Sequence, residues 1–142
     1  MGKVQSAAMA VSRIRDGAVV AVNSSSGLMC PDGVLKALGE RFTAESRPRN
    51  LTMMHPIAAG DMFGIRGVEH IAKPGLIGRI IGGSYPSGPS TSEPPMIWQM
   101  LGANEMPAYN VPSGILFDMH REAAARRPGV LTKVGMDTFA DP

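Results

Sequence analysis

Short apolar runs alternate with longer amphipathic stretches along this chain. Residues 18–23 (AVVAVN) form a compact run rich in valine, which is typical of a strand buried on both faces. Similar runs at residues 51–54, 76–81 and 108–111 predict three further strands, and residues 130–134 indicate a fifth. Turns rich in glycine, proline and serine separate the runs, so each predicted strand is short.

The stretches between the predicted strands carry apolar residues at helical spacing. One predicted helix opens after Pro31 and has four apolar residues on one face: Val34, Leu35, Leu38 and Phe42. Asp61 is placed to N-cap a second helix that runs to about residue 72. Ser92 is predicted to cap a third helix, and Ser113 a fourth.

This alternation predicts an α/β fold with an open, mainly parallel sheet and helices on both faces. A length of 142 residues fits one domain that spans residues 1–142. In such sheets ligands bind at the carboxyl ends of the strands, beside the amino ends of helices. That rule selects four turns that follow predicted strands: Ser24–Gly27, His55–Asp61, Gly82–Gly88 and Pro112–Gly114.

The Ser24–Gly27 turn lies between the first predicted strand and the first predicted helix. Its small side chains allow backbone N–H groups to face a phosphate, a carboxylate or a developing oxyanion. The alternative interpretation is an ordinary turn in which a serine caps the helix. The chain has no Walker A sequence, and this turn lacks the G-x-G-x-x-G pattern, so neither nucleotide-binding motif is predicted.

The histidines do not form a metal-binding pattern. His55, His70 and His120 lack the spacing of zinc ligands, so no metal site is predicted. His55 and Asp61 flank the turn after the second strand and could share a ligand site; the other interpretation is that His55 orients this loop by hydrogen bonding. The sequence has no G-x-S-x-G elbow, and no Ser-His-Asp set can be identified in it.

Composition narrows the classes of partner. Lys and Arg number 14 and Asp and Glu 12, which leaves a net charge of +2, and aromatic residues make up 5% of the chain. These values argue against nucleic acid and against an anionic membrane surface as partners. Cys30 is the only cysteine and cannot form an internal disulfide, so a reducing, cytoplasmic location is predicted.

Seven segments occur in an order that matches one known family. They are Gly17–Leu28, Leu35–Leu38, Pro48–Leu51, Lys73–Gly83, Tyr109–Gly114, Arg121–Val130 and Asp137–Pro142. Together they resemble the family I coenzyme A transferases, in particular the single-chain acetate/propionate/3-oxoacid type. The resemblance covers nearly the whole chain, from about Val4 to the last residue.

The resemblance implies a ping-pong reaction that moves CoA from an acyl-CoA to a free carboxylic acid. In this family a glutamate attacks the thioester and becomes a glutamyl-CoA thioester, and a second carboxylate then takes the CoA. The thioester oxygen becomes an oxyanion in each half-reaction and needs backbone N–H donors. Coenzyme A is therefore a substrate, and no bound cofactor is implied.

The resemblance also assigns site residues. The positions that match the family's oxyanion turn are Ser25, Ser26 and Gly27. This turn is serine-rich where the family is glycine-rich, and serine resists a positive φ. The positions that match the family's Pro-Gln-Gly substrate turn are Pro112, Ser113 and Gly114, so a serine replaces the glutamine. Further substrate contacts are expected from residues of the other strand-end turns: Ser84, Tyr85, His55 and Asp61.

No catalytic residue is predicted in this chain. The family's nucleophilic glutamate lies in the later of two similar α/β halves, and this sequence matches the first half only. We therefore expect an N-terminal part of a longer transferase that is inactive alone and is completed by a C-terminal half or a partner subunit. Its expected ligands are an acyl-CoA and a short carboxylic acid, and a homo-oligomer is expected.

Two other interpretations stay open at this point. Related α/β folds bind sugar phosphates, so the serine turn also suits a non-catalytic module that binds a phosphorylated small ligand. The chain would also fit an inactive remnant that pairs with other chains through exposed sheet edges. A response to sugar phosphates without any response to CoA esters would favour the binding module.

Overall fold

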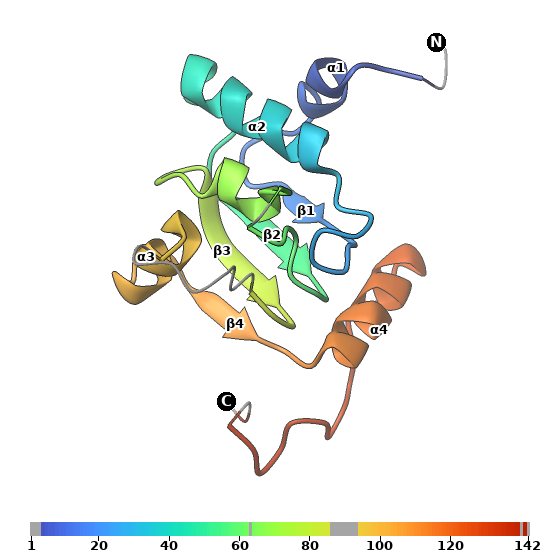
Figure 1. Cartoon of the computed structure of the whole chain (residues 1–142). Coiled ribbons are helices and arrows are strands. Elements are labelled where there is room, and N and C mark those ends of the chain that lie inside the picture. The colour runs from blue at the N-terminus through green and yellow to red at the C-terminus, as the bar shows by residue number, and fades with distance from the viewer. Residues whose placement is uncertain (1–3, 63, 86–93, 140, 142) are drawn as a thin grey trace.

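The strands form one fully parallel sheet in the computed structural model of the chain (Figure 1). The structure describes residues 4–62, 64–85, 94–139 and 141. The strands are β1 (Val19–Ala21), β2 (Leu51–His55), β3 (Ile77–Gly82) and β4 (Ala108–Asn110), side by side in that order. Each agrees with its predicted run to within two residues at either end, which confirms the predicted parallel sheet.

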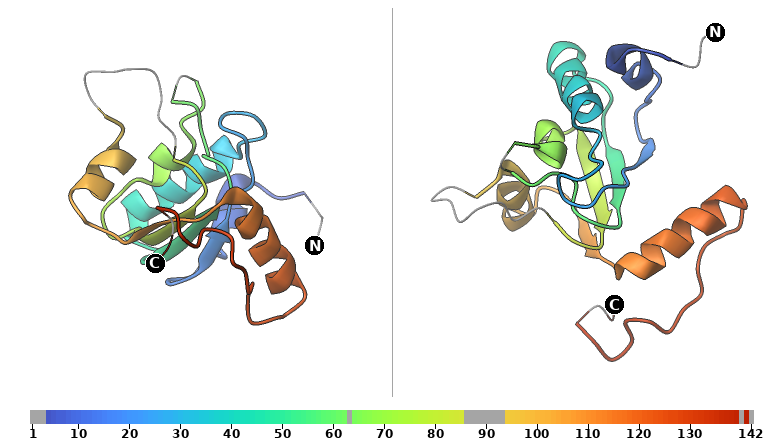
Figure 2. Two further views of the ribbon diagram at one scale, coloured as in Figure 1. Left: turned by 90° about the horizontal axis from the view of Figure 1, so that it is seen from below. Right: turned by 45° about the vertical axis from the view of Figure 1, so that its right-hand side comes forward.

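Helices flank the sheet on both sides (Figure 2). They are α1 (Ala7–Val11), α2 (Asp32–Glu45), the 3₁₀ helix η1 (Gly67–Ile71), α3 (Met96–Gly102) and α4 (Ser113–Ala124). Helices α2, η1 and α3 cover one face of the sheet. Helix α4 begins near the carboxyl ends of the strands and lies on the opposite side. Leu116, the buried residue of α4, accordingly lies outside the main core cluster.

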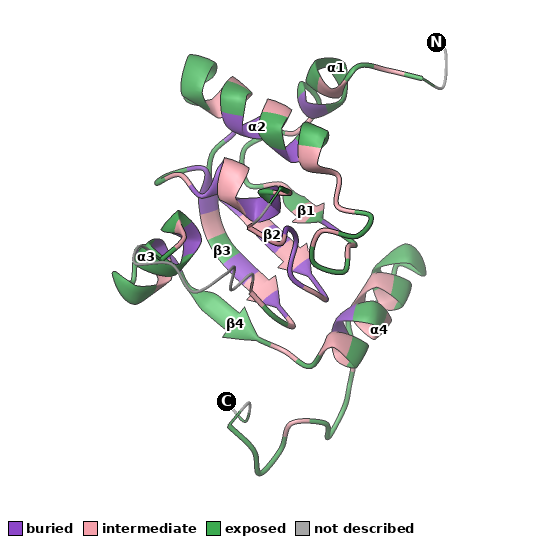
Figure 3. Cartoon of the chain, viewed as in Figure 1, coloured by how far each residue is buried: buried purple, intermediate pink, exposed green. Residues whose placement is uncertain are grey.

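The main core lies on the face covered by α2, η1 and α3 (Figure 3). Leu51 and Met53 of β2 and Ile80 of β3 are at most 1% exposed and belong to the same cluster as Leu38 of α2. Because successive side chains of a strand point to opposite faces, Thr52 points to the other face and is half-buried. This alternation fixes which side of β2 faces the core and hence where its carboxyl end lies.

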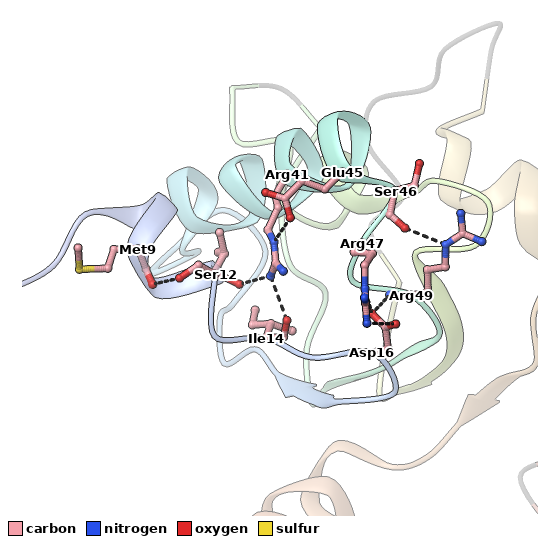
Figure 4. Close-up of polar contacts among 10 residues, drawn as sticks. Met9, Ser12, Ile14, Asp16, Arg41, Glu45, Ser46, Arg47 and Arg49 are labelled. Carbon is pink, nitrogen blue, oxygen red and sulfur yellow. Dashed lines mark hydrogen bonds and ion pairs between the residues drawn. The ribbon is translucent and has the colours of Figure 1, made fainter.

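A polar network holds the amino ends of β1 and β2 (Figure 4). Arg41 of α2 donates to the carbonyl oxygen of Ile14 at 3.0 Å. Asp16 accepts a hydrogen bond from Arg47 at 2.8 Å and another from the N–H of Arg49 at 3.1 Å. The Arg47 hydrogen bond holds the pKa of the Asp16 carboxyl below its ordinary value. The network occupies the end of the sheet opposite the four strand-end turns.

Some predicted elements are wrong. No long helix starts at Asp61, because Met62 has a φ of 61° and Gly67 a φ of 54°, and left-handed residues interrupt a right-handed helix. Only η1 forms in that stretch. The residues 130–134 form no strand and run beside α4 instead. Ser92, the predicted cap of the third helix, lies outside the described residues.

Candidate functional site

The four turns lie at the carboxyl ends of the strands. Residues Pro56–Asp61 of the turn after β2, called the central loop below, form hydrogen bonds with the other three. The N–H of Gly60 donates to the carbonyl oxygen of Ser26 at 2.9 Å, which ties the central loop to the turn after β1. The hydroxyl of Ser113 donates to the carbonyl oxygen of Pro56 at 2.6 Å, which ties it to the turn after β4. The turns selected from the sequence therefore lie together in space.

The peptide groups of Ala58 are held from both sides by serine hydroxyls. The Ala58 N–H donates to Ser84 Oγ at 2.9 Å, and the Ala58 carbonyl oxygen accepts from Ser24 Oγ at 3.3 Å. Ser84 follows β3 and Ser24 follows β1, so the two turns that flank the central loop both hold it. These hydroxyls bond the main chain, and their first role in this structure is to fix the loop.

The predicted oxyanion turn is tight and pinned to the central loop. Ser25 and Leu28 exchange two backbone hydrogen bonds, each 3.0 Å long. Ser26 forms an isolated parallel bridge with Ala59. The N–H of Gly27 has no acceptor among the hydrogen bonds of the described residues, so it is a donor that the turn leaves available.

We expect Ser26→Gly to raise the free energy of unfolding by up to about 1 kcal/mol. Ser26 has a φ of 53°, a left-handed conformation that costs a residue with a Cβ and costs glycine little. Ser25, whose φ is not positive, is the matched control, and Ser25→Gly should lower stability by about 0.5–1 kcal/mol. Urea unfolding of both variants checks this; equal effects of the two changes would contradict it.

The carboxylate of Asp61, at the end of the central loop, lies against the turn after β1. Its Oδ1 accepts hydrogen bonds from the N–H groups of Gly64 at 3.2 Å and Ile65 at 3.0 Å. A Cβ added at Gly27 would meet Asp61 Oδ2. Asp61 therefore caps a short turn, not the helix predicted from it, and it leaves no room for a side chain at Gly27.

His55 lies beneath these turns and supports them. Its side chain is buried, at 1% exposure, and its ring meets that of Tyr85 edge-on at 5.5 Å between centroids. A Cβ at Gly82 would lie 2.8 Å from His55 Nε2, which has no hydrogen-bond partner in the described structure. In this structure the ring packs beneath the turns, and the substrate contact predicted for His55 stays a prediction.

We expect the free energy of unfolding to fall as the pH drops below about 6.5, and His55 to contribute part of this pH dependence. Burial lowers the pKa of His55 from its ordinary 6.5, opposed by a hydrogen bond with the Ser84 backbone. The unfolded chain therefore binds a proton that the folded chain does not, which costs at most about 1.4 kcal/mol per pH unit.

Urea unfolding of wild type and His55→Gln at about pH 7.5 and about pH 5.5 measures this slope. Other titrating groups contribute equally to both proteins, so the difference in slope reports on His55. The variant should show the shallower dependence. An identical slope in the two proteins would show that His55 titrates alike in the folded and unfolded chain.

The predicted substrate turn after β4 borders an open cleft. Pro112 and Gly114 line a cavity of about 410 Å³ together with Val134 and side chains of α4. Pro112, not Ser113, occupies the N-cap of α4, and Ser113 makes no capping hydrogen bond. The prediction that Ser113 caps this helix is therefore wrong, because its hydroxyl reaches the carbonyl oxygen of Pro56 instead.

Tyr85 extends the packing of His55 toward α3. Its ring also meets that of Trp98, at 5.8 Å between centroids, and its hydroxyl donates to the carbonyl oxygen of Tyr109 at 3.3 Å. Burial raises the pKa of the Tyr85 hydroxyl, which stays a neutral donor. The residues 86–88 of the predicted Gly82–Gly88 turn lie outside the described structure.

Cys30 lies near the same turns but is not activated. Burial raises the pKa of its thiol, and the carboxylates of Asp32 and Asp61 raise it further. A protonated thiol is a poor nucleophile, so Cys30 is no candidate for covalent chemistry. Within the described ranges, no group of three or more His, Cys, Asp or Glu side chains could hold a metal ion.

A second polar cluster, which the sequence analysis missed, joins α2 to η1. Asp32 accepts the N–H of Gly67 at 2.7 Å and contacts His70 Nε2 at 3.2 Å. Burial would raise the pKa of Asp32, but these hydrogen bonds hold it below its ordinary value. A cleft of about 650 Å³ with Lys36 and Arg66 on its walls borders the pair. The spacing of Asp32 and His70 in the sequence carries no signal of this pairing.

The parallel sheet and its strand-end turns fit the family that the sequence resembles. A model of the family described as coenzyme A transferase matches residues 4–142. The chain belongs to the coenzyme A transferase family.

Two curated relatives and one solved structure support the same family relationship. The chain is 33% identical over 140 residues to acetate CoA-transferase YdiF of Escherichia coli K12, covering 98% of this chain and 25% of YdiF. It is 32% identical over 142 residues to caffeate CoA-transferase of Acetobacterium woodii, covering 100% of this chain and 26% of that protein. The chain spans about a quarter of the length of these curated relatives.

The solved structure is the acyl-CoA transferase YdiF of Escherichia coli O157:H7 in a thioester complex with CoA. It superposes on this chain with a TM-score of 0.81 at 32% identity, covering 97% of this chain and 26% of YdiF. The two chains therefore share the α/β fold. No helix in the described part of this chain combines the length and apolar character needed to cross a membrane.

Proposed function

We propose that this chain is the N-terminal part of a CoA-transferase and supplies the wall that holds the acyl group of an acyl-CoA. The observation that carries the proposal is the pinned turn after β1, where the Gly27 N–H is left available beside the central loop. An N–H held in place in this way can donate a hydrogen bond to a thioester oxygen and stabilise the negative charge that develops on it.

The reaction proposed is an exchange of CoA between carboxylates. A glutamate carboxylate outside this chain takes CoA from the acyl-CoA. The acyl C–S bond and one glutamate C–O bond break, a glutamyl C–S bond and an acyl C–O bond form, and the first acid leaves as its carboxylate with the oxygen from the glutamate. The reverse exchange passes CoA from the glutamyl thioester to a second, short carboxylic acid. No redox step and no metal are needed.

The described glutamates support a nucleophile outside the chain. None lies in the four strand-end turns. Glu69, for example, accepts the N–H groups of Met96 at 2.7 Å and Ile97 at 3.2 Å, which holds the start of α3. We further propose that a C-terminal half or a partner subunit completes the site, that the whole protein is a homo-oligomer, and that it is cytoplasmic.

The purified chain should not form propionyl-CoA from acetyl-CoA and propionate. Turnover by the chain alone would contradict the proposal that the nucleophile lies elsewhere. Thermal-shift measurements with CoA esters and with sugar phosphates test the ligand class. Stabilisation by acetyl-CoA is expected; stabilisation by sugar phosphates alone would instead support a non-catalytic module for phosphorylated ligands.

A further inference from the structure

One short stretch of backbone connects the strand-end turns, and none of its residues is among the predicted site residues. Ala58, Ala59 and Gly60 of the central loop lie between the turn after β3 and the turn after β1. Ala58 and Ala59 are buried, at 5% and 2% exposure, although they belong to a loop. A buried loop needs partners for its peptide groups, and here the flanking turns provide them.

Hydrogen bonds run through this stretch from one turn to the other. Ser84 Oγ accepts the N–H of Ala58 at 2.9 Å. Two residues further on, the N–H of Gly60 donates to the carbonyl oxygen of Ser26 at 2.9 Å, directly before Gly27. Ala59 is fixed between them, since its carbonyl oxygen accepts the N–H of Val68 at 2.9 Å.

We propose that Ser84 is a positioning residue for the Gly27 amide, acting through Ala58 and Gly60. The proposal deepens the proposed function, since the amide it positions is the donor offered to the thioester oxygen. Ser84 holds the Ala58 N–H, the rigid stretch transmits that position to Gly60, and Gly60 sets the peptide plane between Ser26 and Gly27. Removal of the hydroxyl leaves the Ala58 N–H without its acceptor and loosens the whole path.

The test uses the 142-residue chain and [1-¹³C]acetyl-CoA, with two readouts by NMR. The first is the amide resonance of Gly27 and the hydrogen exchange of the Gly60 amide. The second is the ¹³C resonance of the bound thioester carbonyl, which moves when a donor polarises it. Ser84→Ala should shift the Gly27 amide, speed exchange at Gly60 by about tenfold, and return the carbonyl resonance toward its free value.

Matched variants separate positioning from general damage. Ser84→Thr keeps the hydroxyl and should restore both readouts. Ser12→Ala removes a comparable hydrogen bond, from Ser12 Oγ to the Met9 carbonyl oxygen at 2.8 Å in α1, and should change neither. Should Ser84→Ala fail to fold, Ser24→Ala loosens the same Ala58 peptide from its other side and should give the same shifts.

The outcomes distinguish this inference from the proposed function. A Ser84→Ala chain that changes only at Ala58, with the Gly27 amide and the carbonyl resonance unmoved, would overturn the positioning role. If the wild-type chain does not shift the carbonyl at all, the proposed function fails. The Gly27 and Gly60 amides then still decide whether Ser84 positions the turn.

Discussion

Gly67→Ala should lower the free energy of unfolding by about 3 kcal/mol or more. Gly67 has a φ of 54°, in which a residue with a Cβ is strained. An added Cβ would also overlap the carbonyl group of Ala59, and because that group belongs to the backbone it cannot move aside as a flexible side chain would. Since Ala59 is bridged to Ser26, the clash would disturb the predicted oxyanion turn as well as the fold.

Gly33→Ala is the matched control for this change. Gly33 lies in α2 without a positive φ, and nothing lies within 4 Å of a Cβ built there. Alanine should therefore raise helix stability by about 0.5–1 kcal/mol. Urea unfolding followed by circular dichroism measures both variants. A loss smaller than about 1 kcal/mol for Gly67→Ala would show that the central loop does not pack on η1 as described.

Gly27→Ala should remove most of the response to acyl-CoA while the chain stays folded. A Cβ at Gly27 would meet Asp61 Oδ2 and lie 3.3 Å from Ile65, and both contacts are side chains. The turn or the Asp61 carboxylate must shift, and the Gly27 amide moves with it. In the complete transferase that we propose, displacing this donor should cost about 10²–10³ in kcat.

The control for this second change is a glycine outside the predicted site. Nothing lies within 4 Å of a Cβ built at Gly102, the last residue of α3, so Gly102→Ala should leave the strand-end turns in place. The shift of the [1-¹³C]acetyl-CoA carbonyl on binding compares the two variants. An unchanged shift in Gly27→Ala, or an equal loss in Gly102→Ala, would remove Gly27 from the proposed role.

The strands and the end of the sheet that carries the site could be predicted from the sequence. The apolar run at residues 51–54 reports a buried strand, and parallel strands bring their carboxyl ends to one edge. The burial on both faces predicted for residues 18–23 is wrong, because β1 lies at an edge of the sheet and Val19 is 64% exposed. The predicted oxyanion turn was placed through the resemblance to the family, and in the described structure the N–H of Gly27 in this turn donates to no acceptor.

The contacts among the turns could not be predicted in this way. Ser84 and Ala58 are 26 residues apart, and Ser113 and Pro56 are 57 apart, so no local pattern reports their hydrogen bonds. From the sequence alone, each serine could cap a helix, contact a ligand or hydrogen-bond to another loop. Asp61 shows the same ambiguity, because its carboxylate bonds a nearby turn in place of a helix end.

The measurement that tests the account most directly is a titration of the ¹⁵N-labelled chain with [1-¹³C]acetyl-CoA and, separately, with ribose 5-phosphate. The account predicts that acetyl-CoA moves the Gly27 amide resonance and shifts the thioester carbonyl resonance downfield. Ribose 5-phosphate should leave the Gly27 amide in place. A Gly27 amide that responds to the sugar phosphate and not to acetyl-CoA would contradict the proposed acyl-CoA site.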